Sequence, residues 1–155
     1  MATFAEEIAR LQAVRAKVPG FLTDIARKGI EVAVKYAEEH TPVGNGEARA
    51  TPHPPGAMRD AWRQDSQMEP EAIPNGVRVV LANDVRSPHD PAYSYASDVN
   101  DGHLMDQHYV PELGITVGVH THYIPGLHIA KFAVDAFEQY CAKEQGAVVA
   151  LIVGK

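Results

Sequence analysis

The sequence has little of what several common protein classes need. It contains one cysteine, Cys141, which excludes an internal disulfide and a zinc site made of cysteines alone. No apolar run approaches the roughly 20 residues of a membrane-spanning helix, and the first ten residues include Glu6 and Glu7, unlike a secretory signal. Basic residues are outnumbered, with 14 Lys and Arg against 20 Asp and Glu. We therefore expect a protein of a reducing compartment that does not bind nucleic acid through bulk charge.

Apolar residues, in contrast, are plentiful enough for one folded domain. They make up 45% of the 155 residues and run through the whole chain. A domain of this length buries about 70% of the surface that its unfolded chain exposes. The 11 prolines therefore do not indicate disorder, and we expect a single domain over residues 1–155.

The net charge of −6 is concentrated in one stretch. Residues 83–125 hold Arg86 as the only Lys or Arg against six acidic residues, which gives −5, and they also hold five of the eight histidines. The acidity is therefore a local feature of the chain. Protonation of these histidines near their reference pKa of about 6.5 would remove much of that charge.

Hydrophobic spacing predicts an α+β fold, with long helices at both ends packed against a small antiparallel sheet. Thr3 and Glu6 form a capping-box signature at the start of an extra N-terminal helix over residues 1–20, which Pro19-Gly20 is expected to end. A second helix is predicted over residues 21–40. A last long helix is predicted from Pro125-Gly126 to Gly146.

The middle of the chain reads as short elements. Residues 57–68 and 77–82 are predicted to be strands of a hairpin around Pro74-Asn75-Gly76. A short helix is predicted over residues 92–99 and a strand over 113–119. Residues 147–155 are predicted to be a C-terminal strand or tail, because the apolar run Ala147–Val153 is rich in valine.

Residues 41–56 are predicted to be a loop or arm rich in proline and glycine. A rigid, proline-rich arm suits docking, because little conformational entropy remains to be lost. A plain surface loop explains the same composition, and both interpretations stay open.

Histidines supply the most specific chemical candidate. His120 and His122 are two residues apart and would point to one side of a strand, as two metal ligands do, and His128 follows. His103 and His108 lie upstream, with Asp101 or Asp106 as a carboxylate ligand. Histidines that bond water or backbone are the plainer explanation, because no HExxH spacing is present. We expect no metal or other cofactor.

Catalytic motifs are not found elsewhere. The sequence has no GxSxG, P-loop or GxGxxG motif, and Cys141 lies on the apolar stripe of the last helix, where a buried, inert thiol is expected. An enzyme is therefore not supported.

The order of three motifs is more informative than any one of them. A helix ends in HTPV at residues 40–43, PPGAMRDAW follows at 54–62, and YASDVNDGH follows at 95–103 before a final helix. Over about residues 25–143 this order resembles the tail-component family of tailed bacteriophages, the tail-completion or head-to-tail joining proteins of the neck. That family shows TPVDTG, then GLRxSW, then YAxxVExGT between its helices.

The chain departs from the family pattern at several positions. Gly44-Asn45-Gly46 replaces Asp-Thr-Gly, residues 51–55 are inserted, and the helix over residues 3–18 lies outside the match. Four other positions differ inside the motifs: Met58, Ala61, Asn100 and His103.

The resemblance implies a structural, non-enzymatic virion protein. Such a protein assembles in the host cytoplasm into a homo-oligomeric ring, usually a hexamer, between a head-connector or adaptor protein and a tail-tube or tail-terminator protein. DNA passes through its lumen without specific binding, and no membrane is involved. An acidic lining would avoid gripping phosphate, and residues 83–125 are the candidate for it.

Residue types and the resemblance together nominate an assembly surface. Trp62, Tyr93 and Tyr95 serve either as core anchors or as interface residues, and core is the expected role of Trp62. The full set of candidates is Pro54, Pro55, Gly56, Arg59, Trp62, Tyr93, Tyr95, Asp98, Asp101 and Gly102. Two alternatives stay open: a small metal-dependent hydrolase using His120, His122 and His128, and a monomeric binding module.

Overall fold

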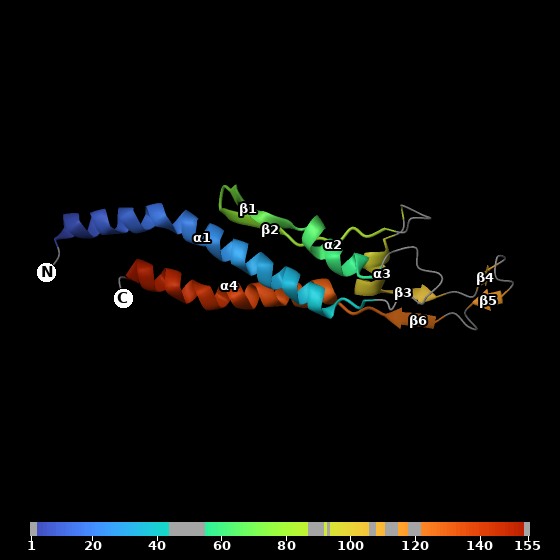
Figure 1. Cartoon of the computed structure of the whole chain (residues 1–155). Coiled ribbons are helices and arrows are strands. Elements are labelled where there is room, and N and C mark those ends of the chain that lie inside the picture. The colour runs from blue at the N-terminus through green and yellow to red at the C-terminus, as the bar shows by residue number, and fades with distance from the viewer. Residues whose placement is uncertain are drawn as a thin grey trace.

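Two long helices form the body of the protein. The computed structural model describes residues 3–43, 55–86, 92, 94–105, 108–110, 115–117 and 122–153. Helix α1 (Phe4–His40) and helix α4 (Ile129–Val153) run side by side in opposite directions along an elongated molecule (Figure 1). Strands pair antiparallel beside and beyond them, which confirms the predicted α+β class.

Helix α1 begins where the capping box predicts. The backbone N–H of Thr3 donates to the Glu6 carboxylate at 2.6 Å, and the N–H of Glu6 donates to the Thr3 hydroxyl at 3.3 Å. The prediction that Pro19-Gly20 ends this helix is wrong, because α1 continues to His40. Proline removes one backbone donor at a cost of about 3 kcal/mol. Packing against α4 on both sides of Pro19 offsets that cost, and the earlier part of α1 runs at a slight angle to the rest (Figure 1).

Helix α4 also extends beyond its predicted end. It begins at Ile129 rather than at Pro125-Gly126, passes through Gly146 and ends at Val153, so the predicted C-terminal strand is wrong. Valine favours strands only where a neighbouring strand pairs with it. Here α1 is the neighbour, and Arg10 donates from Nη1 to the carbonyl of Ile152 at 3.2 Å.

Residues 44–54 of the predicted loop or arm lie outside the described residues, and the segment that follows is a helix and then a hairpin. Residues 57–68 were predicted to be a strand, but Ala57–Asp65 forms helix α2. Met58, Ala61 and Trp62 are buried at helical spacing, which decides between the two forms. Strand β1 (Gln67–Ile73) then pairs antiparallel with β2 (Gly76–Val80) around the predicted turn.

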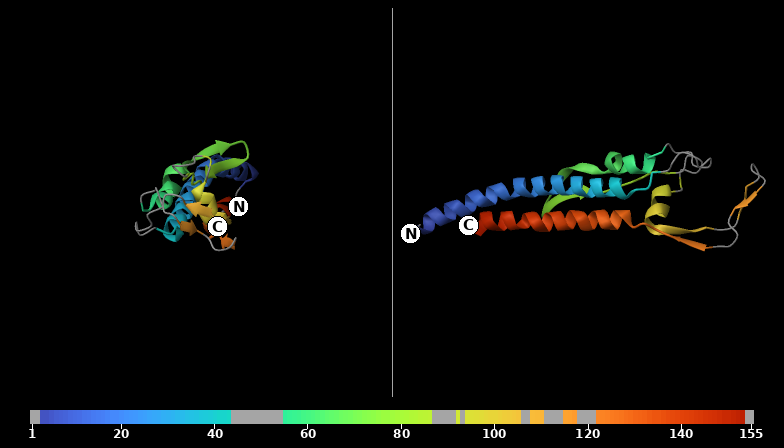
Figure 2. Two further views of the ribbon diagram at one scale, coloured as in Figure 1. Left: turned by 90° about the vertical axis from the view of Figure 1, so that its right-hand side faces the viewer. Right: turned by 60° about the horizontal axis from the view of Figure 1, so that its bottom comes forward.

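The end farthest from the termini carries the remaining elements (Figure 2). Helix α3 begins at Tyr95 rather than at residue 92 and ends at Asp101. The predicted strand over residues 113–119 corresponds to β5 in its described part. Two antiparallel pairs follow α3: β3 (Gly102–Met105) with β6 (His122–Pro125), and β4 (His108–Val110) with β5 (Ile115–Val117).

The core lies where α1, α2 and α4 meet. Its buried side chains include Ile30, Val34, Trp62, Ile129 and Ala133. Gly29 lets α4 approach closely, because a Cβ at that position would lie 2.7 Å from the Phe137 ring. None of the helices in the described ranges is long and apolar enough to cross a membrane.

Candidate functional site

The described residues of the three motifs meet where α1 ends, at the end of the helix pair farthest from the termini. Trp62 of the second motif is 3% exposed, and its Nε1 donates to the hydroxyl of Thr41 of the first motif at 2.7 Å. The Thr41 hydroxyl in turn donates to the carbonyl of Ala37 at 2.6 Å. A buried indole N–H needs such a partner, so the residue that ends α1 also holds α2.

A glycine, Gly56, precedes helix α2 because the backbone there has a left-handed conformation. Gly56 has a φ of 87°, in the left-handed region, and its carbonyl accepts from the N–H of Asp60 at 2.9 Å. Arg59 lies over this turn and donates from Nε to the Asp60 carboxylate at 2.8 Å. That hydrogen bond raises the pKa of Arg59, so the guanidinium is a fixed positive charge at the start of α2.

Arg63 ties the outer side of α2 to α1. It donates to the carboxylate of Glu38 at 2.9 Å and to that of Glu31 at 3.0 Å. The hydrogen bond to Glu38, followed by the one to Glu31, raises the pKa of Arg63. Side chains this exposed are screened by water, so the pairs fix orientation more than they stabilise the fold.

The segment after β2 ties both ends of α2. Asn83 donates from Nδ2 to the carbonyl of Met58 at 2.7 Å, and the N–H of Asp84 donates to the Asp65 carboxylate at 2.7 Å. These bonds fix α2 against the hairpin as well as against α1. The charge of Asp84 is in turn paired with Arg86 at 2.7 Å.

The third motif forms the joint between α3 and α4. Asn100 accepts at Oδ1 from the N–H of Ala130 at 2.8 Å, so its side chain caps the start of α4. Its carbonyl accepts from the N–H of His128 at 2.8 Å. The two segments of the chain approach so closely that a Cβ at Gly126 would overlap the backbone of residues 100–102. Gly102 has a φ of 85°, which favours glycine at the end of α3.

The nominated assembly residues divide into a buried and an exposed group. Trp62 and Gly56 are buried, so Trp62 has the expected core role in the subunit. Pro54 and Tyr93 lie outside the described residues. The others are at least partly exposed around this end of the molecule: Pro55, Arg59, Tyr95, Asp98, Asp101 and Gly102.

The structure describes only some of the histidines that were candidates for metal ligands. His128 is exposed, has a φ of 51° and precedes α4, whereas His120 lies outside the described residues. The backbone of His122 pairs with Met105 in the β3–β6 ladder. Within the described ranges, no group of three His, Cys, Asp or Glu could hold a metal ion.

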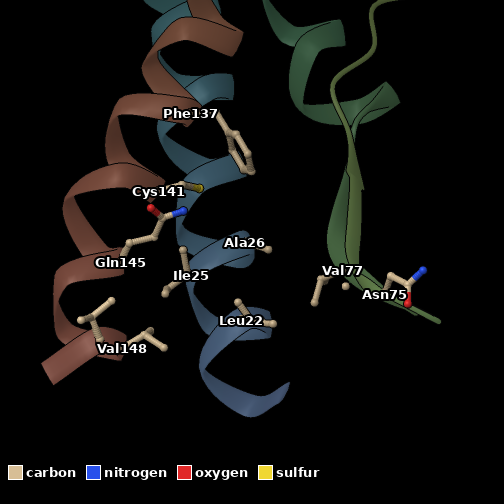
Figure 3. A pocket seen from close by; sticks show the side chains of 11 residues that line it. Leu22, Ile25, Ala26, Asn75, Val77, Phe137, Cys141, Gln145 and Val148 are labelled. Atoms are coloured by element: carbon tan, nitrogen blue, oxygen red, sulfur yellow. The ribbon is translucent and has the colours of Figure 1, made fainter. Parts of the chain in front are cut away.

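Cys141 lines an apolar groove of about 380 Å³ between α1, α4 and the tip of the β1–β2 hairpin (Figure 3). Partial burial, followed by the nearby charge of Glu138, raises the pKa of its thiol, which makes the thiolate scarce at neutral pH. Leu22 and Val77 face the same space from α1 and β2. The groove is therefore lined mainly by apolar side chains, and its thiol is held in the protonated form.

Two features of this end were not predicted from the sequence. Asparagine is a preferred capping residue, so the sequence allowed a capping role for Asn100. It did not indicate the helix that Asn100 caps, because the cap joins residues 30 positions apart. The sequence gave no indication of the ion pairs of Arg63, because Glu31 and Glu38 lie in a different helix. No protein family, characterised protein sequence or solved structure matches this chain.

Proposed function

We propose that this protein is a structural component of the neck of a tailed bacteriophage. In this proposal its copies form a ring, most often of six, that joins the packaged head to the tail through contacts with a head-connector or adaptor protein and a tail-tube or tail-terminator protein. The DNA passes through the ring without specific binding. The protein assembles in the host cytoplasm and resides in the virion.

The placement of the three motifs carries the proposal. Thr41, Trp62 and Asn100 come from distant parts of the chain, and each makes a hydrogen bond that joins two elements at one end of the helix pair. The motif residues on which the family resemblance rests thus make hydrogen bonds that stabilise the fold. This pattern supports an assembly role, because assembly needs a rigid, defined contact surface rather than a reactive pocket.

Charge at the same end supports the passage of DNA. Asp98 is partly exposed and Asp101 is exposed on α3, and Asp106 follows in the sequence. Carboxylates repel phosphate, so a lumen lined by them does not retain the DNA. Tyr95, which is exposed, and Arg59, which is partly exposed, are residue types enriched at protein interfaces.

Electron microscopy of the purified protein and of assembled particles tests the proposal directly. We expect ring-shaped oligomers in negative stain, a matching mass in native mass spectrometry, and density for the chain between head and tail. A protein that forms no ring alone or with its neck partners would contradict it. Ring stability should also change between about pH 6 and pH 7.5, where histidine titrates.

Charge removal tests the lumen separately. Asp98→Asn, Asp101→Asn and Asp106→Asn together should alter ring assembly or DNA ejection. A matched variant, with Asp24→Asn, Glu71→Gln and Asp135→Asn, removes the same charge from α1, β1 and α4, away from the candidate site, and should alter neither. If the first set leaves both assembly and ejection unchanged, the acidic stretch does not line the lumen.

A further inference from the structure

One face of α1 is covered along half of the helix and open along the other half. The covered part runs through Ala26, Gly29, Ala33 and Ala37, all buried among α4, α2 and the hairpin. At 100° per residue the same face continues backward along the helix. It carries Phe4, Ile8, Leu11, Arg15, Val18 and Leu22.

The open half of this face is apolar and exposed. Phe4 is 83% exposed, Ile8 41% and Leu11 45%. The hairpin does not cover them, because its turn lies beside Leu22 and Ile25 and reaches no farther toward the N-terminus (Figures 1 and 3), and α4 beside them leaves them exposed to this extent. A helix with an uncovered apolar stripe of this length normally packs against something.

Helix α4 continues the same surface. Its last eight described residues, 146–153, contain no charged or polar side chain, and a helix that is apolar all round is normally buried. Val149 lines the groove beside the hairpin, and Ile152 lines a second groove with Leu11 and Val18. We define the open face as Phe4, Ile8, Leu11, Leu22, Val149 and Ile152.

We propose that a second copy of this chain covers the open face, with the two α1 helices antiparallel about a two-fold axis near Leu11. The sequence of α1 on either side of Leu11 is self-complementary in this arrangement, with the half-buried Val14 and Val18 as partners of the open face. Phe4 lies opposite Val18 of the second copy, and Ile8 lies opposite Val14. Leu11 lies opposite its own counterpart, so these three positions each meet an apolar residue, whereas Leu22 lies beyond the end of the α1–α1 contact.

Charge supports the same register. Arg15 lies in the middle of the apolar face and has no ion pair within the described part of the chain. A two-fold axis near Leu11 brings Arg15 opposite Glu7 of the second copy. Within one copy Glu7 is already held by Arg10 at 2.6 Å. An arginine covered by a partner needs such a carboxylate, and the antiparallel pair supplies one at both ends.

The area of the open face fits a stable pair. Its exposed fractions correspond to on the order of 600 Å² of apolar side chains, against roughly 800 Å² in total that each partner of a stable complex buries. Because such interfaces are only about 57% apolar, this amount is sufficient.

The pairing goes beyond the proposed neck function. A two-fold contact closes on itself and makes a pair, whereas a cyclic ring of six needs a head-to-tail contact between other surfaces. The two proposals therefore fail separately. Copies that pair without forming rings would count against the neck function alone, and rings whose open faces do not meet would count against the pairing alone.

Cysteine cross-linking tests the register. In a Cys141→Ser background, Leu11→Cys places one thiol per copy near the axis, and oxidation should give a covalent dimer on a non-reducing gel. Ala13→Cys is the matched control, because residue 13 is exposed on the opposite side of α1 and should stay monomeric. Equal cross-linking at both positions, or none at residue 11, would overturn the proposal.

Sedimentation of the full chain tests the face independently. Wild-type protein should be dimeric at micromolar concentration, and Ile8→Glu should weaken the dimer by roughly tenfold or more, because burial leaves the added carboxylate unpaired. Val134→Glu is the control, since Val134 is equally exposed, at 43%, but lies on α4 outside the open face. It should leave the dimer unchanged, and circular dichroism should show both variants folded.

Other occupants of the open face would give different results. A wild-type chain that stays monomeric at about 100 µM overturns the pairing, whether or not it then binds vesicles of phosphatidylglycerol or another protein. A dimer that Ile8→Glu and Val134→Glu weaken equally also overturns it, because the contact would then not lie on the open face.

Discussion

The two halves of α1 carry the same apolar pattern in different surroundings. From Ala26 to Ala37 the pattern meets α2, α4 and the hairpin, and its residues are buried. From Phe4 to Val18 the only described element that it meets is α4, and large side chains remain exposed. An amphipathic pattern thus predicts that a helix face will be covered. It does not say whether the same chain or another one provides the cover.

Stability should follow this division. Substitutions beside the covered half should lower the free energy of unfolding of the subunit, whereas substitutions on the open half should affect association. The largest effect is expected at Trp62, in the core. Trp62→Ala should destabilise the protein by about 4 kcal/mol, because it removes a large buried side chain and leaves a cavity. Urea unfolding measures the loss.

A milder variant at the same position separates the hydrogen bond from packing. Trp62→Phe keeps an aromatic ring but leaves the Thr41 hydroxyl without its donor, and should cost less, about 2 kcal/mol. If Trp62→Ala unfolds at the wild-type urea concentration, the covered half is not the source of stability.

The joint between α3 and α4 should show the next largest effect. Gly126→Ala places a Cβ against the backbone of residues 100–102. Because that backbone cannot move aside as a flexible side chain would, we expect a loss of about 3 kcal/mol, measured by thermal or urea unfolding. A neutral result at Gly126 would contradict the close approach at this joint.

The cap on α4 should contribute less. Asn100→Ala removes the oxygen that accepts from the N–H of Ala130 and should cost about 1 kcal/mol. Asn100→Asp keeps an acceptor at the start of the helix and should recover most of the loss. Equal losses in the two variants would show that the side chain acts by packing instead.

The smallest effect is expected in the open half, with the opposite sign. Gly20 lies inside α1 with no atom within 4 Å of a Cβ built on it. Gly20→Ala should therefore stabilise the protein by about 0.5–1 kcal/mol, as alanine does in an exposed helix, read from the urea midpoint. Destabilisation would indicate that α1 is interrupted after Pro19.

Local signals predicted the features that depend on neighbouring residues. Thr3 and Glu6 gave the start of α1, and Pro74-Asn75-Gly76 gave the hairpin turn. The class of fold followed from the spacing of apolar residues. The helical end of α4 could not be predicted, because the choice between helix and strand for residues 147–153 depends on α1 beside them.

The candidate site was predictable in part. The motifs indicated Trp62 and the segment around Asn100, but not what these residues contact. Their partners, Thr41 and Ala130, are 21 and 30 residues away. Such pairings depend on the tertiary fold and cannot be predicted from the spacing of residues in the sequence.

The antiparallel pairing of α1 with α4 has a consequence for synthesis in the cell. Ile30 and Val34 are among the first core residues to be translated, but Ile129 and Ala133, in the same core, emerge roughly 100 residues later. At about 5–20 residues per second, this takes between about 5 and 20 s. During that interval the apolar face of α1 is without the cover that α4 provides, so this face stays accessible to other proteins until α4 has been made.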